Sequence, residues 1–255
     1  EMQRSLVGSE MCIRDSYFGD TARVPYGSKS KDNIIKFSRQ IIRFLQTENV
    51  KAIVIACNTA SALALDEMQQ EFDLPILGVV KPGAKVAVET TANKRIGLIG
   101  TEANIRSGVY TRYIKSLDDE AKVFEKACPL FVPLVEEGWL HDDITLQVAS
   151  RYLEELKEKD IDTLIMGCTH YPLIRSTIRK VMGDKVNLVN PAYETAIELK
   201  NLLERDNLAN KCDVDSPSSM YRFYVSDAEE KFKLFANSIL PFDITMTKQI
   251  NIENY

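Results

Sequence analysis

The sequence predicts an α/β fold with two similar domains, each a mostly parallel sheet flanked by helices. From residue 32 onward, short apolar runs alternate with longer segments of helical periodicity, a pattern typical of parallel sheets covered by helices. A weak break near 80–83 favours two small sheets over one wide sheet. Finally, an apolar run, a small residue, a cysteine and then hydroxyl or amide side chains occur twice, at 53–61 and 164–172.

Residues 32–117 contain three predicted strands. Apolar residues at helical spacing predict a helix over 32–48. The run KAIVIA is rich in β-branched residues and predicts a buried strand over 51–56, as in parallel sheets. We then expect a helix over 59–72, a strand over 74–80, a helix over 82–91 with proline at its start, a strand over 95–100 and a helix over 103–117.

The alternation continues after residue 117. A strand is expected over 122–127. The clearest helix covers 142–159, because aspartates occupy its first turn and lysines its last turn, which suits the helix dipole. Further along we expect strands over 162–167, 186–189 and 221–225, and helices over 171–182, 192–205 and 228–240.

Composition argues against two classes of partner. Lysine and arginine number 32 against 37 acidic residues, a net charge of −5, whereas nucleic-acid binding needs a basic surface. The longest apolar stretches, such as 52–57 and 75–80, fall far short of the roughly 20 residues that a membrane helix needs. Residues 1–16 also lack the pattern of a targeting segment. We therefore expect neither a nucleic-acid partner nor membrane association.

Cysteine usage indicates a reducing compartment. Because the cysteines are odd in number and widely spaced, they do not form a disulfide scaffold, and a cytoplasmic protein is expected. A zinc site needs three or four ligands, and the pair Cys168 and His170 has no third partner visible in the sequence. No metal site is predicted. The five cysteines are Cys12, Cys57, Cys128, Cys168 and Cys212.

Two of these cysteines, Cys57 and Cys168, lie where predicted strands lead into predicted helices. In open α/β sheets ligands bind outside the carboxyl ends of the strands. The free N–H groups and dipole of a following helix are expected to bind a carboxylate and to lower the pKa of a thiol. A lone free cysteine is usually a small buried hydrophobe, but two in matching turns favour a functional pair. Donors beside the thiols are Asn58, Thr59, Thr169 and His170.

Two opposed thiols suit proton transfer at a carbon centre. A racemase removes a proton from one face of a carbon and returns one to the other face. One thiolate and one thiol can do both steps, with their roles exchanged in the reverse direction. The carbanion that develops must be stabilised in a site that excludes water.

Three further segments are candidates for binding or catalysis, and each also has an ordinary structural interpretation. A turn with exposed N–H groups, a phenol and a hydroxyl would suit a carboxylate, or is a plain surface turn. Thr101 and Asn104 open a predicted helix, either as a simple cap or as binding groups. Glu136 is either an acid near the site or half of a solvated pair. The turn consists of Pro25, Tyr26, Gly27 and Ser28.

Four segments together resemble the glutamate racemases of the aspartate/glutamate racemase family. They are YFGDTARVPYGSKS (17–30), IVIACNTASALALD (53–66), FVPLVEEGW (131–139) and MGCTHYPLIR (166–175). The resemblance runs in order from Tyr17 to about Leu240. It implies two similar α/β domains with the active site between them and no cofactor. With the break near residue 81, it implies a first domain of 17–81 plus 191–255 and a second of 82–190.

The resemblance also implies roles for individual residues. Cys57 would take the proton from D-glutamate, and Cys168 the proton from L-glutamate. His170 would assist Cys168, and Glu136 matches an acid near the family's site. The only implied ligand is L- or D-glutamate, whose D-isomer is a peptidoglycan precursor in the bacterial cytoplasm, with a homodimer as a possible assembly. Substrate-binding residues would be Pro25, Tyr26, Gly27, Ser28, Asn58, Thr59, Thr101, Asn104, Thr169 and His170.

The sequence departs from the family at two places. The family opens with a strand and an Asp-Ser-Gly-x-Gly-Gly segment, and residues 1–16 match none of it. The stretch RSLVGSEMCIRDS resembles translated sequencing adapter, so we expect the first strand and the acid that orients Cys57 to be missing. At Asn104 the family usually has threonine, and an amide still offers a donor.

Two alternatives stay open. The first is that the protein is another enzyme of the superfamily, either an aspartate racemase or a single-thiol decarboxylase. Two intact thiols argue against the decarboxylase, while the PYGS and GCTHYP motifs favour glutamate. The second is that the protein is an inactive member that acts only as a binding or regulatory protein, since residues 1–16 do not match the family's opening segment.

Overall fold

The computed structural model describes residues 15–209, 221–244 and 246–255. The strands are β1 (Ser16–Gly19), β2 (Ile53–Ile55), β3 (Ile76–Gly78), β4 (Arg95–Gly100), β5 (Lys122–Ala127), β6 (Thr163–Gly167), β7 (Asn187–Val189), β8 (Arg222–Val225) and β9 (Thr247–Gln249). The helices are α2 (Lys31–Thr47), α3 (Asn58–Glu71), α4 (Val80–Thr90), α5 (Glu102–Ser107), α6 (Val109–Leu117), α7 (Phe131–Glu136), α8 (Asp143–Lys157), α9 (Arg175–Met182), α10 (Pro191–Arg205) and α11 (Glu229–Ile239). Three 3-10 turns are η1 (Tyr26–Ser28), η2 (Tyr171–Ile174) and η3 (Ile252–Asn254).

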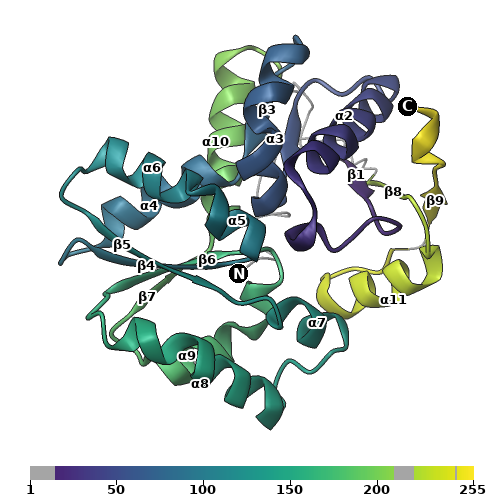
Figure 1. Cartoon of the computed structure of the whole chain (residues 1–255). Coiled ribbons are helices and arrows are strands. Elements are labelled where there is room, and N and C mark those ends of the chain that lie inside the picture. The colour runs from purple at the N-terminus through teal and green to yellow at the C-terminus, as the bar shows by residue number, and fades with distance from the viewer. Residues whose placement is uncertain (1–14, 210–220, 245) are drawn as a thin grey trace.

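The largest sheet has the order β5-β4-β6-β7, with every neighbouring pair parallel. Helices α4 and α6 lie on one of its faces, and α8 and α9 on the other (Figure 1). Alternation along β6 explains this arrangement, because Leu164 and Met166 pack with α8 and α9 while Ile165 packs with α4 and α6. A strand buried on both faces is therefore an apolar run without polar alternation.

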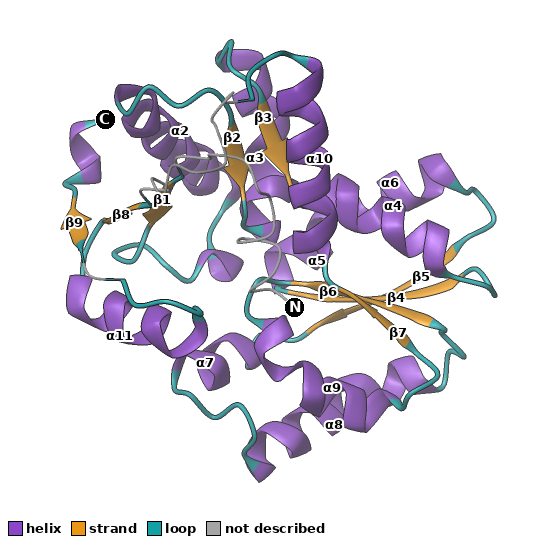
Figure 2. Ribbon diagram, turned by 180° about the vertical axis from the view of Figure 1, so that it is seen from behind, coloured by secondary structure: helices purple, strands orange, loops and turns teal. Residues whose placement is uncertain are grey.

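The other strands form two smaller parallel sheets. One has the order β1-β8-β9, and the other pairs β2 with β3. Helices α2 and α3 pack against them through one apolar cluster, which includes Ile34, Met68 and Tyr224. The C-terminal helix α11 lies beside α7 in both views (Figure 2), and its Phe235 packs against the core of the four-stranded sheet.

These elements confirm the α/β class and its parallel sheets, and most predicted elements are present within two residues of the predicted bounds. Three parallel sheets are hydrogen-bonded in the described residues, where two were expected. The helix predicted over 103–117 is two helices, because Gly108 adopts a left-handed conformation with φ 62° and ends α5. The division into domains at residues 81 and 190 stays a prediction.

Five short elements were not predicted: β1, η1, α7, β9 and η3. Strand β1 pairs with β8, a partner more than 200 residues away that no local pattern reveals. The unmatched residues 1–16 lie mostly outside the described residues, except for 15 and 16. Within the described part of the chain, no helix combines the length and apolar character needed to cross a membrane.

Candidate active site

The two candidate thiols follow the carboxyl ends of strands from different sheets. Cys57 comes two residues after β2 and is the N-cap residue of α3, in an extended conformation. It is half-buried and free. Its carbonyl accepts the first helical hydrogen bond from Ser61 N at 2.8 Å. The backbone N–H groups of Thr59 and Ala60 and the Thr59 hydroxyl are directed at the thiol and favour its ionised form.

Cys168 directly follows β6 and is 7% exposed. The sequence predicted an α-helix over 171–182 after this residue, and that prediction is wrong for the first turn. The chain instead forms the 3-10 turn η2 with Pro172 near its start, and α9 begins only at Arg175. The backbone N–H that favours the Cys168 thiolate therefore comes from His170, and the thiol does not lie at an α-helix N-terminus.

A carboxylate, an imidazole and the thiol of Cys168 form a row. The Sγ of Cys168 lies 3.8 Å from Nδ1 of His170, and Nε2 of His170 lies 3.4 Å from Oε1 of Glu136 at the end of α7. His170 holds the pKa of the Glu136 carboxyl below its ordinary value, with a smaller contribution from Lys231. A base oriented by a carboxylate is the arrangement that activates nucleophilic or basic thiols. The Thr169 hydroxyl lies 3.4 Å from the same Nδ1.

The predicted substrate-binding turn lies beside Thr101 and close to Cys57. Gly27 in η1 packs on Thr101, and a Cβ added to this glycine would lie 2.7 Å from Thr101 Cβ. Only glycine permits this close approach. Tyr26 lies close enough to Cys57 for a thiolate there to raise the phenol's pKa, and burial raises it more. Pro25 precedes the turn and Ser28 ends it.

The amide and hydroxyl candidates are buried and hydrogen-bonded. Asn58 accepts a hydrogen bond of 2.7 Å from the hydroxyl of Tyr110 in α6. The hydroxyls of Thr59 and Thr101 share a hydrogen bond of 2.8 Å, which joins α3 to the start of α5. Asn104 lies in the first turn of α5 and is 2% exposed. The bond between Thr59 and Thr101 thus links a candidate beside Cys57 to the candidates that open α5.

The two thiols influence each other electrostatically. Burial is the main cause that raises the pKa of Cys168 to about 12, and a thiolate at Cys57 raises it further. Burial also raises the pKa of Cys57, against the donors of Thr59 and Ala60. The expectation that helix N-termini lower both pKa values is therefore wrong in direction, because desolvation of the thiolate outweighs the N–H groups.

Alkylation by iodoacetamide tests this electrostatic picture. At pH 7 a thiol with a pKa of about 12 is a thiolate to roughly one part in 10⁵, so Cys168 should react slowly. We expect its rate to rise about tenfold for each pH unit between 7 and 10. Cys57 should react first, because it is half-buried and has nearby donors, and the fully buried Cys128 last. Peptide mass spectrometry gives the three rates, and fast, pH-independent labelling of Cys168 would contradict the assignment.

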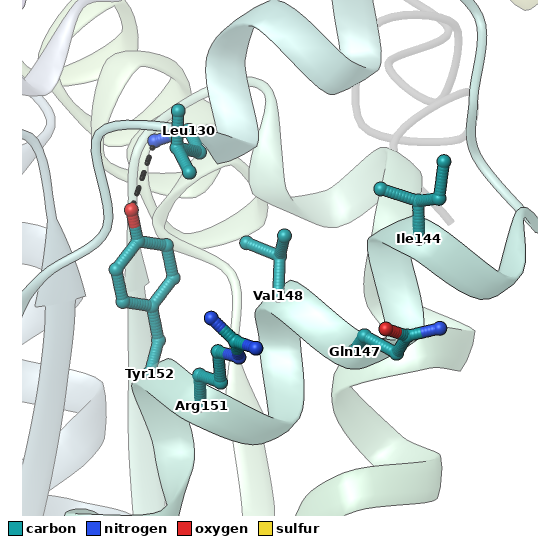
Figure 3. Close-up of a pocket in the computed structure, with 6 residues that line it drawn as sticks. All are labelled: Leu130, Ile144, Gln147, Val148, Arg151 and Tyr152. Carbon is teal, nitrogen blue, oxygen red and sulfur yellow. Dashed lines mark hydrogen bonds between the residues drawn. The ribbon is translucent and has the colours of Figure 1, made fainter.

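A separate hollow of about 420 Å³ lies over α8 and does not include either thiol. Figure 3 shows its lining side chains and the hydrogen bond of 3.3 Å from Leu130 N to the Tyr152 hydroxyl. The lining residues are Leu130, Ile144, Gln147, Val148, Arg151 and Tyr152. In the described part of the chain, no three histidine, cysteine or acidic side chains come together as metal ligands.

Sequence reasoning missed two groups near these residues. Asp20 is 8% exposed and accepts hydrogen bonds from Tyr26, Arg23 and Ser226. Ser226 follows β8, so only the folded chain brings it to Asp20. The Tyr110 hydroxyl donates to Asn58 in another helix, and this bond has no local sequence signal.

Comparisons with known proteins agree with this architecture. Residues 12–197 match the model of the Asp/Glu/Hydantoin racemase family. The glutamate racemase of Geobacter metallireducens is 42% identical over 237 residues, which cover 93% of this chain and 87% of that protein.

Two solved structures are similar over most of their length. The crystal structure of glutamate racemase isoform RacE1 from Bacillus anthracis has a TM-score of 0.87 at 34% identity, covering 97% of this chain and 94% of that one. Glutamate racemase from Francisella tularensis, solved in complex with D-glutamate, has a TM-score of 0.86 at 36% identity, covering 94% and 88%. Family model, sequence relatives and structures agree, and the chain belongs to the Asp/Glu/Hydantoin racemase family.

Proposed function

We propose that this protein is a racemase that interconverts L- and D-glutamate with Cys57 and Cys168 as its two proton-transfer groups and without a cofactor. The electrostatic coupling of the two thiols carries the proposal. A thiolate at Cys57 raises the pKa of the Cys168 thiol, so the pair disfavours two thiolates at once and reacts as one thiolate beside one thiol. A two-base racemase starts each turnover from that state.

The proposed reaction uses the two thiols in turn. The Cys168 thiolate takes the Cα proton of L-glutamate, and the electron pair of the broken C–H bond stays on the substrate as a carbanion delocalised into its carboxylate. The Cys57 thiol then gives its proton to the opposite face and becomes a thiolate. D-glutamate follows the same steps in reverse. His170, oriented by Glu136, assists proton transfer at Cys168.

The buried donors around the thiols would hold the substrate. Backbone and side-chain donors at both turns suit carboxylate binding, and fixed donors stabilise the charge that develops next to Cα. Glutamate as substrate is supported by relatives that are named glutamate racemases, one of them solved with D-glutamate. The proposed substrate-binding residues are Pro25, Tyr26, Gly27, Ser28, Asn58, Thr59, Thr101, Asn104, Thr169 and His170.

The wider role follows from this reaction. D-glutamate made in this way would enter peptidoglycan synthesis and so support the bacterial cell wall and cell shape. We place the enzyme in the cytoplasm, where free thiols persist and L-glutamate is present. The proposed assembly is a homodimer.

Racemisation itself is the test. The purified protein, dialysed against EDTA, is incubated with L-glutamate, with D-glutamate and with L-aspartate, and optical activity is followed by circular dichroism. We expect both glutamate isomers to reach the racemic mixture without pyridoxal phosphate or metal. Absence of activity with glutamate, or activity that requires either addition, would overturn the proposal. Faster turnover of aspartate would reassign the substrate.

A further inference from the structure

We propose that Asn104 is a positioning residue that fixes the turn carrying Cys168 relative to the turn carrying Cys57. The proposal rests on the two-thiol function above and adds a second role for Asn104, which is already among the proposed substrate-binding residues. Three hydrogen bonds and one close fit carry the inference, and all of them involve the first turn of α5.

The hydrogen bonds run from one thiol turn to the other. Thr59, two residues after Cys57, shares a bond of 2.8 Å with the Thr101 hydroxyl. That hydroxyl accepts from the backbone N–H of Asn104 at 3.2 Å. The side-chain Nδ2 of Asn104 then donates to the carbonyl of Gly167 at 3.0 Å, and Gly167 directly precedes Cys168.

The Asn104 amide fits a space that two glycines leave open. Gly100 and Gly167 are register partners in the parallel pair β4 and β6. A Cβ at Gly100 would lie 2.9 Å from Asn104 Nδ2, and a Cβ at Gly167 would lie 3.0 Å from the same atom. The amide therefore lies across the ends of both strands, which ties the exit of β6 to the start of α5.

Stability alone does not explain an asparagine here. Its side-chain oxygen Oδ1 is buried and has no hydrogen-bond partner among the described residues. A buried acceptor without a partner opposes folding, whereas an apolar side chain of similar size would leave no such atom. What the amide contributes is the bond from Nδ2 to the carbonyl next to Cys168.

Position matters strongly at this thiol. Proton transfer from Cα needs the sulfur within close reach of the C–H bond, and a shift of about 1 Å can cost about 10²-fold in rate. If the Gly167 carbonyl loses its donor, the Cys168 turn is free to move away from its working position. The Cys57 turn keeps its own helix N-cap position and its bond to Thr101.

Two variants of similar size test the role, Asn104→Leu and Asn104→Asp. Both remove the donor to Gly167, and the second keeps a polar side chain should leucine fail to fold. We expect kcat to fall about 10-fold to 10²-fold, and KM for both isomers to rise as well, because Asn104 is also a proposed substrate-binding residue. The matched control is Thr195→Val, which removes a buried hydroxyl bond of 2.7 Å to the Pro191 carbonyl in α10.

Isotope effects separate positioning from a merely structural role. On kcat/KM, the effect with 2-deutero-L-glutamate should grow, because proton removal by the misplaced Cys168 becomes more rate-limiting. The isotope effect with 2-deutero-D-glutamate should shrink, because proton removal by Cys57 becomes less rate-limiting. Thr195→Val should change neither effect.

The outcomes are distinct. Unchanged kcat in both Asn104 variants, or a loss of activity with both isotope effects unchanged, would overturn the positioning role while leaving the racemase proposal intact. If the unmodified protein does not racemise glutamate, the proposed function fails first. Thermal melts of all four proteins show whether folding accounts for any loss.

Discussion

Replacing either thiol by an alcohol should abolish racemisation. For Cys57→Ser and for Cys168→Ser we expect the rate with both glutamate isomers to fall at least about 10³-fold, because an alkoxide is far less accessible than a thiolate at neutral pH. Each variant should keep one half of the chemistry. With Cys57→Ser, the remaining thiol should slowly exchange the Cα proton of L-glutamate with solvent, and with Cys168→Ser the exchange should occur on D-glutamate.

Cys128→Ala is the matched control for these variants. Cys128 is a buried thiol in the core of the four-stranded sheet, close enough to Cys168 for a thiolate there to raise the pKa of Cys128. Its replacement should retain racemisation, with some loss of thermal stability from the small cavity. Equal loss of activity in all three variants would show that the cysteines act through folding. Residual racemisation in Cys57→Ser near the original rate would remove that thiol from the reaction.

Removing the carboxylate of Asp20 should have the largest effect on stability. Its oxygens accept from Arg23 Nε at 2.9 and 2.8 Å and from Ser226 Oγ at 2.9 Å, and the Tyr26 hydroxyl also donates to it. Asp20→Ala leaves the guanidinium of Arg23, 11% exposed, without its main partner. We expect the free energy of unfolding to fall by about 3 kcal/mol in urea titrations, as for a broken buried ion pair.

Substrate binding should weaken in the same variant. Asp20 joins the end of β1 to Tyr26 in the turn η1 and to Ser226 after β8, so its loss frees the turn that is proposed to hold a carboxylate. KM for glutamate should therefore rise. The control is Glu71→Ala, which breaks a half-exposed pair with Arg39 and should cost less than about 1 kcal/mol. Similar losses in the two variants would argue against the Asp20 network.

Sequence reasoning succeeded where the signal is local. The strands over 95–100 and 122–127 have the bounds that were predicted for them. The motifs around Cys57 and Cys168 were identified because each follows such a run. Helix ends and the left-handed Gly108 are also local in principle, but many glycines lie within helices and only the structure shows which one ends α5.

The parts that were missed depend on distant contacts. Asp20 gains its role from Ser226, and Asn104 from Gly167, and neither partner is near in sequence. The direction of the thiol pKa shifts was wrong for the same reason. A strand followed by a helix is visible in the sequence and suggests stabilising N–H groups, whereas the burial that raises the pKa of Cys168 comes from elements far along the chain.

Deuterium incorporation in heavy water tests the central claim most directly. L-glutamate and the enzyme are mixed in deuterium oxide, the two isomers are separated during the first few per cent of conversion, and Cα deuterium in each is measured by mass spectrometry. Two thiols on opposite faces predict one deuterium in nearly every D-glutamate formed, with little in the remaining L-glutamate. Product that retains the original hydrogen, or substrate that exchanges as fast as product appears, would show a single base serving both faces and contradict the two-thiol account.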